Sequence, residues 1–79
     1  MTVDVRLFAT LADALGVRSG DVMPVSLADG AAVGALIESL GVDPQAVHLT
    51  LVNGRVVHDR SHGLHDGDRV GLFSPVGGG

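Results

Sequence analysis

The group in this chain best suited to chemistry is the carboxylate of Gly79, which follows Gly77 and Gly78. An α-carboxyl group has an ordinary pKa of about 3.5, so at neutral pH it is ionised and must be activated before its carbon can react. Attack on the α-phosphate of ATP would convert it into an acyl adenylate. Because glycine has no Cβ, a glycine tail can pass through a narrow tunnel that larger side chains would block. We therefore predict that residues 77–79 are a flexible tail that threads a partner's active site, with Gly79 as the reactive end.

Three histidines could suggest a metal site. His58, His62 and His65 are spaced four and then three residues apart, like ligands on one helix face. However, the stretch contains Gly63, and a structural zinc site needs a closed shell of four ligands, usually with cysteine, which this chain lacks. We interpret them as exposed loop histidines and predict no metal site.

The remaining polar residues do not suggest an enzyme. Asp66 and Asp68 flank Gly67 and are interpreted as turn residues that bind their own backbone. The chain has no nucleophile elbow and no phosphate-binding glycine loop before a helix. We predict that no side chain is catalytic and that no cofactor is bound.

Composition narrows the class of partner. The 79 residues allow one small domain, and a hydrophobic content of 46% is typical of a folded one. The formal charge is −4, every basic residue is arginine, and Phe8 and Phe73 are the only aromatic residues. Nucleic-acid binders need cationic charge and often stacking platforms, so that class is excluded, and proteins with a basic groove are expected instead. The lack of a long apolar run or a signal-like start predicts a cytoplasmic protein without a membrane partner.

The hydrophobic periodicity predicts an α+β domain with a mixed sheet of four to five strands packed on one main helix. Strands are expected at 3–9, 22–27, 47–52, 55–58 and 69–73, the main helix at 31–40, and short helical turns at 11–16 and 42–46. Pro24 predicts that its strand is an edge or bulged strand. The pair Asn53-Gly54 predicts a tight hairpin. Asp29 and Gly41 are the expected start and stop signals of the helix.

Strand parity predicts which side chains share a face. Phe8 and Phe73 lie opposite the apolar faces of their strands, so both rings are expected on the outer face of the sheet. On the strand at 47–52, Leu49 and Leu51 are expected to point inward, which places Thr50 and His48 with the rings if this strand lies alongside. An exposed aromatic patch on a small domain usually marks a partner site. The alternative is that a loop buries one or both rings, or that the strand register is shifted by one residue.

Three segments together resemble the ubiquitin-like sulfur carriers of the MoaD/ThiS family. They are Val52-Asn53-Gly54-Arg55, Leu64-His65-Asp66-Gly67-Asp68-Arg69-Val70 and Phe73-Ser74-Pro75-Val76-Gly77-Gly78-Gly79. The segment Leu7-Phe8-Ala9-Thr10-Leu11 also resembles the opening of MoaD, the small subunit of molybdopterin synthase. The resemblance covers nearly the whole chain, and the combination of motifs is specific.

This resemblance implies a β-grasp fold over residues 1–76, with the first and last strands adjacent and parallel. It implies an E1-like adenylyltransferase of the MoeB or ThiF type, which consumes ATP to adenylate Gly79, and a sulfur donor that converts the adenylate to a thiocarboxylate. The sulfur would pass to the large subunit of molybdopterin synthase, of the MoaE type, or to another acceptor enzyme. The chain itself would be a protein co-substrate. Phe8, Phe73, Pro75 and Val76 would form the partner-binding surface.

The pathway stays open at this point. The turn at 11–16 and the Pro75-Val76 pair resemble MoaD, whereas the three-glycine ending resembles ThiS, and carriers for cysteine or tungsten-cofactor synthesis share these traits. Ser74 stands where MoaD proteins more often have proline. A second class is a ubiquitin-like modifier joined through Gly79 to a lysine of a target protein. A third is a plain binding module with an inert tail, and removal of Gly79 separates it from the other two.

Overall fold

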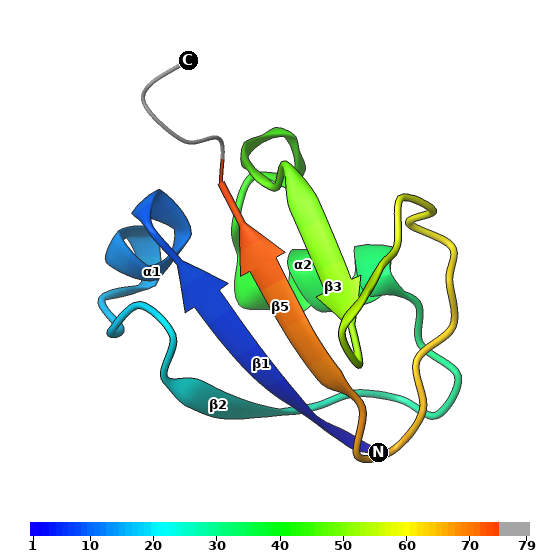
Figure 1. Cartoon of the computed structure of the whole chain (residues 1–79). Helices are drawn as coiled ribbons and strands as arrows, with labels where there is room; N and C mark the ends of the chain where they lie inside the picture. The colour runs from blue at the N-terminus through cyan, green and yellow to red at the C-terminus, as the bar shows by residue number, and fades with distance from the viewer. Residues whose placement is uncertain (75–79) are drawn as a thin grey trace.

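The computed structural model describes residues 1–74, which form one mixed sheet with a main helix packed across one face (Figure 1). The elements are β1 (Thr2–Phe8), α1 (Thr10–Leu15), β2 (Val22–Ser26), α2 (Val33–Leu40), the 3-10 turn η1 (Pro44–Ala46), β3 (Leu49–Val52), β4 (Arg55–Val56) and β5 (Arg69–Phe73). The five strands lie in the order β2-β1-β5-β3-β4. This arrangement confirms the predicted α+β, β-grasp fold. No helix within residues 1–74 is long and apolar enough to span a bilayer.

The sheet topology follows several predictions made from single residues. The first and last strands, β1 and β5, are parallel neighbours, and the other pairs are antiparallel. Strand β2 is an edge strand, which suits Pro24 because proline cannot donate to a second neighbour. Asn53 and Gly54 have positive φ angles of 51° and 81°, as a two-residue hairpin turn requires. Gly41 ends α2 in the left-handed conformation, with φ 73°.

The core lies between the sheet and α2. Alternate residues of β1 and β5 point into it, and the apolar stripe of α2 packs against them. The largest fully buried side chains are Leu7, Leu36, Ile37, Leu64, Leu72, Val3, Val5, Val33 and Val70. Burial of this apolar face provides the main driving force for folding of so small a domain.

The start of α2 differs from the prediction. The helix begins at Val33 rather than Ala31, and no side chain caps it. Asp29 is not its cap, because the Asp29 carboxylate lies 3.1 Å from the N-terminal ammonium group of Met1. The expected cap was therefore wrong.

Backbone carbonyl groups of the loop between β4 and β5 replace the missing cap. The N–H of Val33 donates to the carbonyl oxygen of His62 at 3.0 Å, and the N–H of Gly34 donates to that of Arg60 at 2.8 Å. The Arg60 guanidinium in turn donates to the carbonyl oxygens of Pro44 and Val47 at 3.2 and 3.0 Å. Because this loop leaves the sheet to cover the helix start, β4 ends at Val56, earlier than expected.

The orientation of β3 was also predicted wrongly. Thr50 and Val52 are buried on the face of the sheet that packs on α2, whereas Leu49 and Leu51 lie half-buried on the outer face. The reason is register: Leu49 is the Cα partner of Phe73, so the two side chains share a face. Thr50 therefore does not join the aromatic rings, and His48 precedes the strand.

Candidate functional site

Phe8 and Phe73 are the last residues of the neighbouring strands β1 and β5, and their rings stack on each other. They are direct Cα partners across the parallel β1/β5 pair. Their ring centroids are 4.2 Å apart and their planes differ by 2°. Adjacent strands lie about 4.8 Å apart, so paired rings that rise from one face meet almost parallel. The structure confirms that the two rings lie together on the outer face.

A glycine makes room for this stack. A Cβ built on Gly71 would lie 3.3 Å from Cε1 of Phe73, 3.6 Å from Cε2 of Phe8 and 3.9 Å from Cβ of Leu51. The rings thus extend over the bare backbone of β5. Gly20 also lies close to the stack, and a Cβ there would be at an ordinary contact distance, 3.6 Å, from Cε1 of Phe8.

Three rows of side chains cross the outer face at successive levels along the strands. From the level at which β1 and β5 end, they are Phe8, Phe73 and Leu49; then Val22, Arg6, Gly71, Leu51 and Val56; then Pro24, Asp4, Arg69 and Asn53. The face therefore changes from apolar to charged with distance from the ends of the central strands. We call the apolar residues Phe8, Phe73, Leu49, Leu51, Val22 and Val56 the docking patch.

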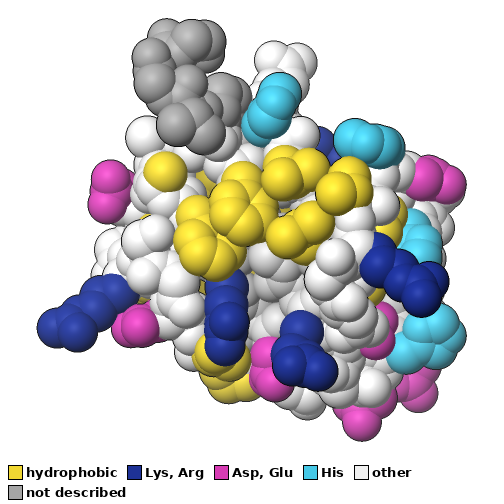
Figure 2. All heavy atoms as spheres, in the orientation of Figure 1, with side chains coloured by type: hydrophobic (Ala, Val, Ile, Leu, Met, Phe, Trp, Pro, Cys, Tyr) yellow, Lys and Arg dark blue, Asp and Glu magenta, His cyan; other side chains and the backbone are white. Residues whose placement is uncertain are grey.

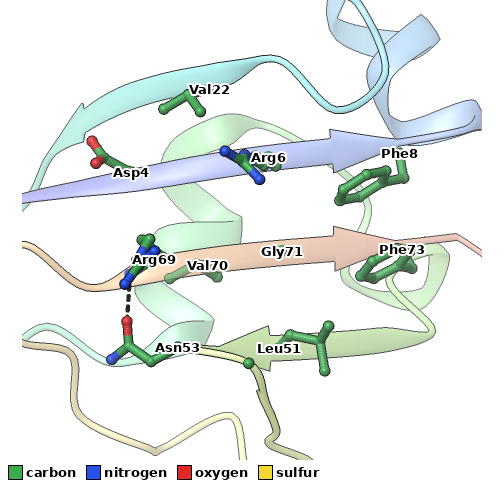
Figure 3. Close-up of a pocket in the computed structure, with 11 residues that line it drawn as sticks. Asp4, Arg6, Phe8, Val22, Leu51, Asn53, Arg69, Val70, Gly71 and Phe73 are labelled. Carbon is green, nitrogen blue, oxygen red and sulfur yellow. Dashed lines mark hydrogen bonds between the residues drawn. The ribbon is translucent and has the colours of Figure 1, made fainter.

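Figure 2 shows hydrophobic side chains gathered in a band over β1, β5 and β3, with arginines along its lower border. Val22 and Val56, at the two ends of the middle row, are 50% and 52% exposed. A depression of about 390 Å³ lies in this face, and its lining includes both rings at one end, Asp4 and Arg69 at the other, and Arg6 between them (Figure 3). Clustered apolar exposure of this kind on a small domain marks a protein contact surface.

The Asn53 side chain joins the hairpin to the start of β5. Its Nδ2 donates to Oδ1 of Asp68 at 2.9 Å, and its Oδ1 accepts from the N–H of Arg69 at 2.9 Å (Figure 3 shows the second bond). The N–H of His65 donates to Oδ2 of Asp68 at 2.8 Å. Burial raises the pKa of Asp68, but the bonds from Asn53 and His65 outweigh it, so the pKa falls below its ordinary 3.8. Through Asn53, the ionised Asp68 carboxylate thus helps to hold the hairpin against the start of β5.

The predicted site residues divide into two groups. Phe8 and Phe73 are brought together, as expected. Pro75, Val76, Gly77, Gly78 and Gly79 lie outside the described residues. Ser74, the last described residue, follows Phe73 directly and so lies next to the aromatic end of the docking patch.

Sequence reasoning missed most of the docking patch. It assigned Leu49 and Leu51 to the core and did not single out Val22 or Val56. A possible signal was the pairing of the strand at 49–52 with the last strand, since that pairing fixes its parity.

The histidines do not form a metal centre in the part of the chain that the structure describes. Within residues 1–74, no group of three or more His, Cys, Asp or Glu side chains could hold an ion. His65 is exposed, and its Nδ1 lies 3.9 Å from the Asp68 carboxylate.

A comparison with models of known protein families identifies the family of this chain. The model of the ThiS family matches residues 5–79. The chain belongs to the ThiS family. The solved structures that resemble it include one described as putative molybdopterin converting factor, subunit 1, from Pyrococcus furiosus. The two share 32% identity with a TM-score of 0.75, over 96% of this chain and 99% of the other.

Two further solved structures extend the comparison. SAMP1 from Haloferax volcanii is 26% identical, with a TM-score of 0.76 and full coverage, 100%, of both chains. A complex of subunits 1 and 2 of the molybdopterin-converting factor from Helicobacter pylori contains a chain with the same fold, at 22% identity, a TM-score of 0.62 and 100% coverage of both chains. None of the curated proteins matches this sequence. This ThiS-family member is thus a small ubiquitin-like protein of the group that includes sulfur carriers and small modifiers.

Proposed function

We propose that this protein is a cytoplasmic sulfur carrier for molybdopterin synthesis and that Gly79 carries the sulfur. The observation behind this proposal is the full-length similarity, at 32% identity, to a putative molybdopterin converting factor subunit 1. The position of the docking patch at the end of β5 gives it a physical basis, because a partner bound there lies next to the start of the tail.

The chemistry requires two partner-catalysed steps. A carboxylate oxygen of Gly79 attacks the α-phosphorus of ATP, and pyrophosphate leaves. A sulfur nucleophile at the oxidation level of sulfide then attacks the acyl carbon, and AMP leaves, so that one carboxylate oxygen is replaced by sulfur. An E1-like adenylyltransferase of the MoeB or ThiF type binds and consumes the ATP, and this chain contributes the carboxylate and the surface that docks it.

The length of the tail sets how far the reactive carboxylate can lie from the docking patch. Gly79 comes five residues after Ser74. An extended chain spans at most about 3.6 Å per residue, so the carboxylate can enter an active site within about 18 Å of Ser74. Gly77 and Gly78 allow this segment to pass through a narrow channel, and Pro75 and Val76 contact the partner at its entrance.

The acceptor in this proposal is a large subunit of the MoaE type. The Helicobacter pylori complex pairs subunits 1 and 2 of a molybdopterin-converting factor and includes a chain of this fold. In such a pair the carrier supplies sulfur from its chain end, and the larger subunit holds the molecule that receives it.

A second candidate is a protein modifier joined through Gly79 to a lysine of another protein. It is favoured by the similarity to SAMP1, at 26% identity over both whole chains. Both functions need the adenylate, and they differ only in the nucleophile that takes the acyl group.

Mass spectrometry tests the proposal. The protein is incubated with ATP, a sulfide donor and the E1-like enzyme of the same genome, and a second sample is isolated from its host. A species in which sulfur replaces one oxygen at Gly79 is expected in both samples, and the variant without Gly79 should not form it. A branched peptide from Gly79 to a foreign lysine would instead establish a modifier. An unmodified carboxylate in both samples would refute carrier and modifier alike and leave an inert binding module.

A further inference from the structure

We propose that Arg6 and Arg69 recognise carboxylates, so that the protein docking on the outer face presents acidic side chains beside its apolar contact residues. This inference rests on the proposed function, because it specifies the chemistry of the activating enzyme's contact surface. It also reverses what the net charge of −4 alone suggests, namely a basic partner.

The two arginines occupy defined positions next to the docking patch. Arg6 lies two residues before Phe8 on β1, and its Cα partners are the uncharged Gly71 and Val22. Arg69 lies at the next level on β5. Figure 3 shows Arg6 between Asp4 and Phe8 on β1 and Arg69 beside Asn53, and both arginines line the depression together with the aromatic rings.

Neither guanidinium group has a partner among residues 1–74. Within residues 1–74 the ion pairs are Met1 with Asp29 and His65 with Asp68, and no hydrogen bond is donated by the guanidinium of Arg6 or Arg69. Only the backbone N–H of Arg69 is bonded to a side chain, that of Asn53. By contrast, the Arg60 guanidinium is held by two carbonyl groups of the chain. Arg6 and Arg69 therefore remain available as donors to a partner.

The local charge balance is positive although the chain is acidic. The charged residues that line the depression are Asp4, Arg6 and Arg69, which leaves a surplus of one positive charge. Asp4 is the Cα partner of Arg69, but the two side chains form no ion pair within 4 Å in residues 1–74. This face can therefore accept an acidic partner although the chain as a whole carries a formal charge of −4.

Arginine suits this position chemically. Its planar guanidinium binds a carboxylate through two parallel hydrogen bonds and stays charged at all physiological pH values. Exposed ion pairs are weak, but a pair that is desolvated next to an apolar contact is stronger, and charge at the rim of an interface changes the association rate and its salt dependence. Arg6, one level from the stacked rings, is the residue that a docked partner would desolvate more.

The test measures docking and sulfur loading separately, with the whole protein and its purified E1-like enzyme. The variants are Arg6→Glu, Arg69→Glu and Asp4→Asn. The control is Arg55→Glu, which makes the same change of charge at an exposed residue outside the depression. Circular dichroism melts confirm that each variant folds. Affinity is measured without ATP at low and high salt, and thiocarboxylate formation is measured with ATP and sulfide.

Arg6→Glu and Arg69→Glu are each expected to weaken binding about tenfold or more at low salt, with a smaller difference at high salt. Asp4→Asn is expected to tighten binding, and Arg55→Glu to have little effect. Equal losses for Arg6→Glu and Arg55→Glu, with normal thiocarboxylate on the wild type, would overturn this inference and leave the proposed function intact. A wild type that neither binds the enzyme nor gains sulfur would overturn both.

Discussion

The backbone N–H of Gly34, in the first turn of α2, donates a 2.8 Å hydrogen bond to the carbonyl oxygen of Arg60. This contact joins the helix start to a loop from much later in the chain. A Cβ at Gly34 would lie 3.3 Å from that same oxygen. Glycine at this helical position is therefore explained by the close approach of the loop.

Gly34→Ala tests this contact. Alanine is favoured over glycine in a helix by about 1 kcal/mol, so propensity alone predicts a gain in stability. We expect instead a lower free energy of unfolding, because the new methyl group pushes the Arg60 carbonyl away from the helix start. Urea unfolding measures the difference. Ala35→Gly, at the exposed neighbouring position, is the control and should cost about 1 kcal/mol. A stability gain from Gly34→Ala would show that the loop does not constrain the helix.

The pair Leu51→Ala and Val52→Ala tests the orientation of β3. Val52 is 6% exposed and Leu51 faces out. We expect Val52→Ala to cost about 2 kcal/mol and Leu51→Ala less than about 1 kcal/mol, although the leucine substitution removes more atoms. Leu51→Ala should weaken binding to the activating enzyme, while Val52→Ala should not once folded. The opposite order of stabilities would restore the inward orientation expected from the sequence.

Asp68→Asn is expected to flatten the acid limb of the stability curve. In the folded protein the pKa of Asp68 lies below the ordinary 3.8, because hydrogen bonds from Asn53 and His65 outweigh the effect of burial. The stabilisation is therefore complete well above pH 3.8 and is lost as the pH falls through the lowered pKa. Melting temperatures recorded from pH 6 down to about pH 2 measure this loss. Asp21→Asn, an exposed loop substitution, serves as the control and should retain the wild-type slope.

Ala9→Gly is expected to stabilise the protein. Ala9 follows the stacked Phe8 and has φ 55° and ψ −129°, a region that a residue with Cβ adopts only at a cost. Relief of this strain should add about 1 kcal/mol, which corresponds to about 4–8 °C in melting temperature for a domain of this size. Ala14→Gly, in the exposed part of α1, should lower the melting temperature. If both substitutions lower it equally, the backbone at Ala9 is not strained.

The sequence by itself determined the features that depend on local chemistry. Period-two alternation located β1 and β5, proline placed β2 at an edge, and Asn53-Gly54 identified the hairpin, because each signal acts within a few residues. The glycines at 77–79 are likewise the local signal behind the prediction of an activated chain end, and that prediction awaits the loading experiment. The parity of Phe8 and Phe73 then predicted that both rings lie on the outer face. The family resemblance predicted that their strands are adjacent.

The tertiary structure decided what depends on contacts between distant segments. Leu49 and Leu51 are as hydrophobic as any core residue, but pairing with β5 gives them the parity of Phe73 and puts Thr50 inside. Asp29 has the chemistry of a helix cap, yet the carbonyl groups of a later loop occupy that position. In both cases backbone hydrogen bonding between remote segments overrides side-chain preference, because a buried N–H or carbonyl group left without a partner costs more than a leucine partly exposed.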